Sequence, residues 1–142
     1  MEAEFNIFTD FNQFIVIDST ADWDDLYEKW TDETVESMFV QGDGYIAVGT
    51  MRNLYAPVLI RFDSDRPLPP GSLDKTAHGV LSVPSGVLRV SGITDGGRSG
   101  GTVHAPPGTY RVLVEYLNLE PIDDYGIEGN DRYVITLTKA DA

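Results

Sequence analysis

Cysteine is absent from this 142-residue sequence, and histidine occurs only twice, at His78 and His104. The absence of cysteine excludes disulfide bonds, thiolate metal sites and cysteine nucleophiles. A transition-metal site would need both histidines to converge with carboxylates, whereas a single histidine in a strand is more often packed or hydrogen-bonded. We therefore expect no transition metal and no cofactor.

Long apolar runs and a secretory signal are absent as well. No stretch reaches the roughly eighteen apolar residues of a membrane-spanning helix, and the acidic start MEAEFNIF lacks the basic and apolar parts of a signal peptide. These features favour a cytoplasmic protein that does not enter a membrane. The length and the 42% of hydrophobic residues predict a single domain over residues 1–142 with an ordinary core.

Basic residues are scarce, because ten Lys and Arg side chains stand against 23 Asp and Glu side chains and give a net charge of −13. Proteins that bind nucleic acid or anionic membranes normally neutralise phosphates with basic side chains, so neither is an expected direct ligand. Two explanations of the charge remain open. It can serve solubility alone, or it can match a cationic partner.

The acidic residues are concentrated in two segments, which favours the cationic partner over solubility alone. Lys29 is the only base between residues 18 and 43, a segment that holds nine acids: Asp18, Asp22, Asp24, Asp25, Glu28, Asp32, Glu33, Glu36 and Asp43. Residues 115–131 hold six acids and no base. Carboxylates in loops are also calcium ligands, so an alternative is a calcium-dependent or small-ligand-binding module. Its candidate ligands are Asp22, Asp24 and Asp25, or Asp123, Asp124, Glu128 and Asp131.

The pattern of apolar residues predicts a mainly β protein, an antiparallel β-sandwich of about eight or nine short strands. Strands are expected near residues 5–8, 13–18, 45–48, 56–62, 77–83, 86–93, 109–117 and 132–138. The segments 77–83 and 86–93 surround the turn Pro84-Ser85-Gly86, and alternation in residues 87–91 predicts a hairpin there. Residues 19–29 are expected to be a surface loop, in which Trp23, Leu26 and Tyr27 can form one helical turn.

One short helix is expected near residues 31–40. Thr31 is a suitable N-cap, and Asp32 and Glu33 fall in the first turn, where carboxylates favour the positive end of the helix dipole. Apolar residues at positions 35, 38 and 39 give a narrow face for packing on the core. The sequence Gly42-Asp43-Gly44 is expected to end the helix before a strand begins at Tyr45.

Aromatic side chains among the acids suggest a protein interface. Trp23, Tyr27 and Trp30 lie within the first acidic segment, and aromatic anchors surrounded by charge are typical of binding hot spots. Alternatively, the two tryptophans fasten the segment to the core. The glycine-rich sequence TDGGRSGG at residues 94–101 is either a hairpin tip or an anion cradle that includes Arg98.

Several short motifs at fixed spacing resemble the competence protein J family, also called the DNA-entry nuclease inhibitor (Nin) family. The motifs are Phe14 with Val16, the sequence Trp30-Thr31-Asp32-Glu33, Asp43-Gly44 followed by Ile46, Arg52-Asn53, and a strand that ends at Arg61-Phe62. The resemblance covers residues 11–62 and then thins to Gly108-x-Tyr110. The long acidic segment before Trp30 and the glycine-rich loop depart from the family pattern.

The resemblance implies a non-catalytic bacterial competence protein, of immunity type, that binds a DNA nuclease and keeps it inactive. An acidic surface is compatible with this role, because its carboxylates can occupy the cationic groove in which a nuclease holds DNA phosphates. We expect the partner-binding residues to be Asp22, Trp23, Asp24, Asp25, Tyr27, Glu28, Asp32, Glu33 and Glu36. The family-signature residues Trp30, Asp43, Gly44, Arg52 and Asn53 are expected to be chiefly structural.

Overall fold

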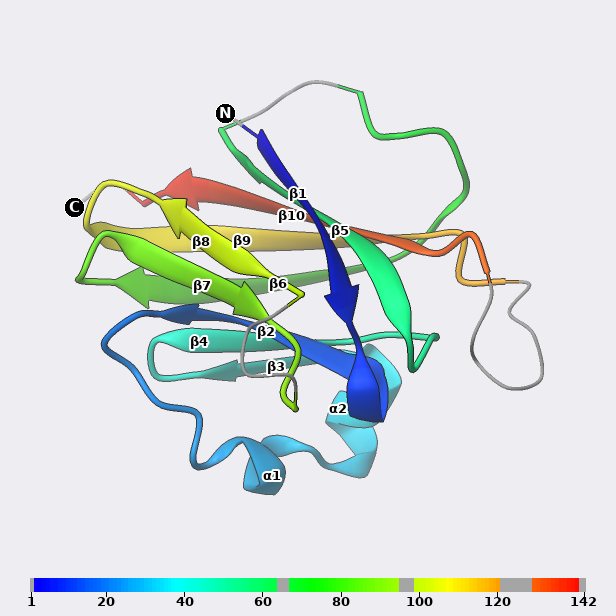
Figure 1. The fold of residues 1–142 in the computed structure, drawn as a ribbon, viewed down its shortest axis with the longest axis horizontal. Helices are drawn as coiled ribbons and strands as arrows, with labels where there is room; N and C mark the ends of the chain where they lie inside the picture. The colour runs from blue at the N-terminus through cyan, green and yellow to red at the C-terminus, as the bar shows by residue number, and fades with distance from the viewer. Residues whose placement is uncertain (1, 64–66, 95–98, 121–128, 141–142) are drawn as a thin grey trace.

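The computed structural model describes residues 2–63, 67–94, 99–120 and 129–140. Within these ranges the chain forms ten strands in two five-stranded sheets, with two short helices and one 3₁₀ turn (Figure 1). Sheet A has the order β1 (Glu2–Phe8), β5 (Tyr55–Phe62), β10 (Arg132–Lys139), β9 (Gly108–Leu117) and β6 (Leu73–Val83). Sheet B has the order β3 (Phe39–Gly42), β4 (Tyr45–Gly49), β2 (Gln13–Asp18), β7 (Val87–Ser91) and β8 (Gly101–His104).

The prediction of a mainly β, sandwich-like fold is confirmed, although the strand count of eight or nine was too low for the described part of the chain. All strand pairs are antiparallel except one, since β10 runs parallel to β5 with Ile135 opposite Ile60. Buried side chains from both sheets meet in one core cluster, which includes Phe14 and Ile46 of sheet B and Tyr116 and Tyr133 of sheet A. No helix among the described residues is long and apolar enough to cross a membrane.

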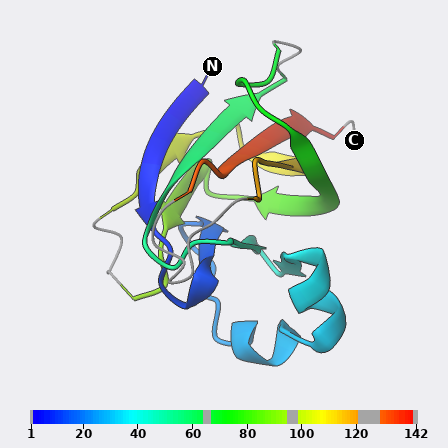
Figure 2. The same ribbon diagram turned by 90° about the vertical axis from the view of Figure 1, so that its right-hand side faces the viewer.

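The helical segment covers the outer face of sheet B (Figures 1 and 2). It contains α1 (Leu26–Lys29) and α2 (Asp32–Ser37), and the 3₁₀ turn η1 (Asp10–Asn12) precedes β2. Strand β2 is buried on both faces, because Phe14 and Val16 point into the main core while Ile15 and Ile17 pack with Leu26 of α1. The expected helical turn near Leu26 is therefore present, and it forms the lid of a second, smaller core.

The predicted helix over residues 31–40 is too long, because α2 ends at Ser37. Met38 adopts a left-handed conformation with φ of 59°, and residues 39–42 form β3, which pairs with β4 in a hairpin. The turn at Asp43-Gly44, expected to end the helix, instead joins these two strands, and Gly44 has φ of 80°. Phe39 is aromatic and Val40 is β-branched, and both types favour strands. Pairing with β4 therefore outweighs the helical spacing between Val35 and Phe39.

The predicted hairpin at Pro84-Ser85-Gly86 is wrong, because the two strands that flank it belong to different sheets. Strand β6 pairs with β9, whereas β7 pairs with β2 and β8. Local alternation identified both strands correctly but carries no information about their partners. The expectations for Arg98 in the glycine-rich loop and for Asp123, Asp124 and Glu128 in the second acidic loop fall outside the described residues.

Candidate functional site

The segment that joins β2 to β3 is fixed at its start by the buried carboxylate of Asp18. This carboxylate accepts hydrogen bonds from the backbone N–H of Thr20 at 2.9 Å and from the N–H and Oγ of Ser85 at 3.0 and 2.7 Å. Burial by itself raises the pKa of Asp18, but the hydrogen bonds from Thr20 and Ser85 outweigh it and hold the pKa below its ordinary value of 3.8. Asp18 is therefore a structural anchor and not part of the exposed acidic surface.

Helix α1 is attached to sheet B by Leu26 and by the side chains of the two residues that flank the helix. Leu26 is buried, Asp25 Oδ1 accepts a hydrogen bond from the Tyr45 hydroxyl at 2.6 Å, and Trp30 Nε1 donates to Gln13 Oε1 at 2.8 Å. The hydrogen bond from Tyr45 lowers the pKa of Asp25, and the Lys29 ammonium, 3.7 Å from Asp25 Oδ2, acts in the same direction. Trp30 therefore fastens the segment to the core, as one of the two interpretations of the tryptophans requires.

Helix α2 begins with the predicted N-cap. The Thr31 hydroxyl accepts from the Thr34 N–H at 3.3 Å, and the Thr34 hydroxyl accepts in return from the Thr31 N–H at 2.7 Å. At the other end, the Tyr116 hydroxyl donates to the Met38 carbonyl at 2.6 Å, and the Lys75 ammonium donates to the Glu36 carbonyl. The C-terminal end of α2 is thus tied to strands β9 and β6 of sheet A.

All nine predicted partner-binding residues are exposed on this segment. Trp23 is 38% exposed and Tyr27 is 90% exposed, so the second of these makes almost no contact within the chain. The acidic members of the set are Asp22, Asp24, Asp25, Glu28, Asp32, Glu33 and Glu36. The segment that carries these residues lies on the side of the molecule that faces away from sheet A (Figures 1 and 2).

A groove of about 1130 Å³ lies between the helical segment and the turns that flank β2 and β4. We call it the apolar groove, because most of its lining is apolar: Phe11, Trp23, Leu26, Tyr27, Trp30, Val35, Met38, Met51 and Ile93. Asp24 and Glu36 also line it. Sequence reasoning found Trp23 and Tyr27 but missed Phe11 and Met51, which are 68% and 38% exposed. The signal that could have identified them is a bulky apolar residue beside turn residues, because side chains in turns are often exposed and such a residue is then available for binding. Sequence reasoning also assigned Val35 to the helix face that packs on the core, which is wrong, because Val35 is 61% exposed.

A second, polar hollow of about 550 Å³ lies beside the apolar groove. Five aspartates line it, and Asp24 is shared with the groove: Asp18, Asp22, Asp24, Asp25 and Asp43. Even so, no group of three or more His, Asp or Glu side chains in the described parts of the chain is placed to hold a metal ion. The calcium alternative therefore gains no support from the first acidic segment.

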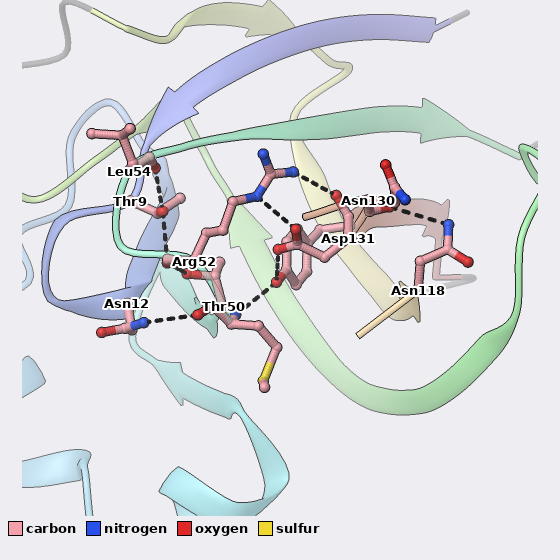
Figure 3. A network of polar contacts seen from close by, with 10 residues as sticks. Thr9, Asn12, Thr50, Arg52, Leu54, Asn118, Asn130 and Asp131 are labelled. Carbon is pink, nitrogen blue, oxygen red and sulfur yellow. Dashed lines mark hydrogen bonds and ion pairs between the residues drawn. The ribbon is translucent and has the colours of Figure 1, made fainter. Parts of the chain in front are cut away.

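The family-signature residue Arg52 forms an ion pair with Asp131 at the start of β10 (Figure 3). Arg52 Nε lies 2.6 Å from Asp131 Oδ1, and Arg52 Nη2 donates to the Asp131 carbonyl at 3.0 Å. The other carboxylate oxygen accepts from the Tyr133 hydroxyl at 2.6 Å, which itself accepts from the Met51 N–H at 2.8 Å. Burial raises the pKa of Tyr133, and the neighbouring Asp131 carboxylate raises it further.

This network places Arg52 in a structural position. The Arg52 carbonyl accepts from the hydroxyls of Thr9 and Thr50 at 2.9 and 2.6 Å, so the β4–β5 connection is tied to β1 as well as to β10. Asp131 belongs to the predicted second acidic loop, but its side chain is fully buried and does not contribute to an acidic surface. Asn53, in contrast, is exposed.

The requirement for glycine at position 44 is structural as well. Its carbonyl accepts from the Asp18 N–H at 2.8 Å, and its φ of 80° is a conformation that other residues rarely adopt. A Cβ atom at this position would lie 2.8 Å from the Cβ of Ala21. The Asp43-Gly44 turn therefore sets how closely the helical segment approaches the β3–β4 hairpin.

Comparison with known proteins places this arrangement in a family. None of the curated proteins matches the chain significantly. Among solved structures, the fold is similar to ComJ from Bacillus subtilis, described as an inhibitor of the DNA-degrading activity of NucA, with a TM-score of 0.71, 22% identity and coverage of 99% of this chain and 96% of that chain. It is also similar to the crocagin biosynthetic gene J protein, with a TM-score of 0.60, 16% identity and coverage of 99% of both chains.

These two likenesses show that the fold is shared over nearly the whole described chain. The sequence itself gives the more specific result, because the family model of Competence protein J (ComJ) matches residues 6–138. That match extends well beyond residues 11–62, where the motifs are most evident. The chain belongs to the Competence protein J family.

Proposed function

We propose that this chain is a non-catalytic inhibitor that binds a bacterial DNA nuclease and blocks its activity. Membership of the Competence protein J family supports the proposal, and ComJ of Bacillus subtilis is described as an inhibitor of the DNA-degrading activity of NucA. The observation that carries it to this chain is the exposed helical segment, in which seven carboxylates accompany Trp23 and Tyr27.

The acidic segment acts through electrostatic attraction to the nuclease. A DNA nuclease needs a cationic surface to hold phosphates, and carboxylates such as Asp24, Glu28 and Glu33 can pair with the same Lys and Arg side chains. Attraction over this distance raises the association rate and orients the two proteins before contact. The bound inhibitor then excludes DNA from the surface that it covers. We propose the partner-binding set given above as the contact surface.

Plasmid cleavage tests this proposal directly. The purified chain is added in excess to each purified DNA nuclease of the bacterium that encodes it, and loss of supercoiled DNA is followed over time. We expect cleavage by one of them to stop at about one inhibitor per nuclease. Undiminished cleavage by every one of these nucleases would show that the proposed function is wrong.

Matched charge variants identify the surface. Asp24→Asn/Glu36→Gln neutralises two carboxylates of the helical segment, whereas Glu4→Gln/Glu120→Gln neutralises two exposed carboxylates outside it. Both variants change the net charge equally, so a general effect of charge would weaken inhibition in both. We expect weaker inhibition only from the first, at the lowest inhibitor concentrations.

We further propose that the protein acts in the cytoplasm as a single domain that needs no cofactor. The shared core cluster supports one domain, because it contains buried side chains from all strands except β3. The cysteine-free sequence fits a reducing compartment.

A further inference from the structure

We propose that the apolar groove holds an apolar side chain of the nuclease, carried on a segment whose neighbouring residues are basic. The inference rests on the proposed function and deepens it, because it assigns the groove and the surrounding carboxylates different tasks. The carboxylates attract the partner, and the groove retains it.

Several of the large apolar side chains that line the groove are exposed. Tyr27 of α1 and Val35 of α2 lie along one wall, and Phe11 and Met51 belong to the turns that flank β2 and β4. Aromatic residues and methionine are enriched at protein interfaces, and tyrosine is among the residues that contribute most binding energy there. A volume of about 1130 Å³ is large enough for more than one side chain of a bound segment.

The backbone under Phe11 provides an independent observation. Phe11 and Asn12 both have positive φ, of 58° and 57°. Asparagine tolerates this conformation, but for a bulky residue such as phenylalanine it costs free energy. Hydrogen bonds from Asn12 N to the Thr9 carbonyl and from Thr50 N to the Asn12 carbonyl hold the turn in this form. The fold thus maintains a strained turn whose effect is to leave Phe11 68% exposed beside the groove. Nothing inside the described chain compensates by burying that ring.

The charges around the groove select the kind of segment that enters it. Asp24 and Glu36 belong to its lining. Further exposed carboxylates lie on α1 and α2, at Glu28, Asp32 and Glu33. Lys29, the only base between residues 18 and 43, is paired with Asp25. An apolar side chain flanked by Lys or Arg therefore fits this surface. The apolar side chain packs against the groove lining, and the Lys or Arg side chains pair with the surrounding carboxylates.

The same charges disfavour other occupants. A second copy of the chain would be repelled, because each copy has a net charge of −13 and Asp24 and Glu36 would face acidic residues of the other copy. Nucleic acid would be repelled for the same reason. A basic protein segment is the occupant that the surface favours.

Binding kinetics separate the two tasks. The nuclease that the chain inhibits is immobilised, and association and dissociation rates are measured for Phe11→Ala, Tyr27→Ala and Val35→Ala. We expect dissociation to become at least about tenfold faster for Tyr27→Ala and Phe11→Ala, with association rates changed by less than about twofold. Asp24→Asn/Glu36→Gln should show the opposite pattern, with slower association and nearly unchanged dissociation.

Exposed residues outside the groove supply matched controls. Tyr55 is 48% exposed and Val80 is 46% exposed, and neither lines the groove, so Tyr55→Ala and Val80→Ala remove the same side chains as Tyr27→Ala and Val35→Ala. We expect both controls to dissociate at the rate of the unchanged protein. Melting temperatures of all variants establish that each one is folded before its rates are compared.

The possible failures are distinguishable. If the unchanged chain inhibits its nuclease but all three groove variants dissociate at the unchanged rate, the inference is wrong and the proposed function stands. If the unchanged chain inhibits no nuclease, the proposed function is wrong and the inference falls with it. If sedimentation shows a dimer that Tyr27→Ala dissociates, the groove is a self-association surface and the inference is also wrong.

Discussion

At the scale of single residues, the buried ion pair of Arg52 and Asp131 joins parts of the chain that are 79 positions apart. The Asp131 side chain is fully buried, and the Arg52 side chain is 13% exposed. Removing one partner of such a pair leaves a charge without compensation in the interior, which costs more than the pair itself contributes. The Arg52 guanidinium also contacts two acceptors of Asp131 at once, a carboxylate oxygen and the backbone carbonyl, a task that a lysine ammonium performs poorly.

Arg52→Ala is expected to lower the free energy of unfolding by about 3 kcal/mol, measured by urea denaturation. Arg111→Ala is the control, because Arg111 is an exposed arginine of β9, and its loss should cost less than about 0.5 kcal/mol. Inhibition per folded molecule should be unchanged in both variants. An Arg52→Ala protein of normal stability that has lost inhibition would show that Arg52 contacts the partner.

Asp18→Asn tests the lowered pKa of Asp18. Because the folded pKa lies below the ordinary 3.8, ionised Asp18 stabilises the fold above that pH, and the contribution is lost as the pH falls through the folded value. The variant should therefore melt at a lower temperature than the unchanged protein at neutral pH, and the difference should shrink at pH values below 3.8. A difference that stays constant down to about pH 2 would contradict this assignment. Glu4→Gln controls for the loss of one exposed negative charge.

Some residue roles were predictable from the sequence and others were not. The Thr31 cap follows from local chemistry, and the structure shows its reciprocal hydrogen bonds with Thr34. Asp131 looked like a loop carboxylate, because nothing in the neighbouring residues indicates that Arg52 lies beside it. Phe11 was missed because its exposure depends on a left-handed backbone that no composition rule anticipates.

At the scale of elements, the β3–β4 hairpin determines how the helical segment sits on sheet B. Its turn at Asp43-Gly44 leaves no room for a Cβ between Gly44 and Ala21. The hydroxyl of Tyr45, the first residue of β4, donates to Asp25, the N-cap residue of α1. The sequence predicted the turn residues correctly but assigned them to the end of a helix. Periodicity over six or seven residues does not separate a short helix from a helix followed by a strand.

Gly44→Ala is expected to destabilise the protein by at least about 1 kcal/mol, because alanine at this φ is strained and its Cβ meets the Cβ of Ala21. Gly44→Ala/Ala21→Gly removes the steric contact but keeps the backbone strain, so it should recover only part of the loss. Thermal melting of the two variants measures both contributions. A double variant as stable as the unchanged protein would mean that steric contact alone makes glycine necessary.

At the scale of the whole molecule, the sequence predicts the charge but not the order of the strands in the sheets. The net charge of −13 and the position of the acids are read directly from the sequence, and the structure places those of residues 22–36 at the surface. Strand number was nearly predictable, since each strand has its own local pattern. Strand order was not, because β6 and β7 are adjacent in sequence and lie in different sheets.

The charge of the molecule predicts a strong effect of salt on the formation of the nuclease complex. Between about 0.01 M and 0.5 M salt, we expect the association rate to fall at least about tenfold, because screening shortens the range of attraction. The dissociation rate should change much less, since the apolar groove is insensitive to screening. Stopped-flow mixing at several salt concentrations measures both rates, and an association rate independent of salt would show that the carboxylates do not guide binding.

Strand β10 is the last described strand along the chain, yet it lies in the middle of sheet A, between β5 and β9. A ribosome therefore synthesises β1, β5, β6 and β9 before the strand that joins β5 to β9 has been made. Sheet A cannot be completed during synthesis of the first 131 residues. Until then β5 and β9 each have one edge without the hydrogen-bonding partner that β10 later supplies. Asp131, the buried partner of Arg52, also arrives only at this stage. Folding of sheet A is thus a late event of translation, and a chain interrupted before residue 132 lacks the centre of that sheet and not merely its edge.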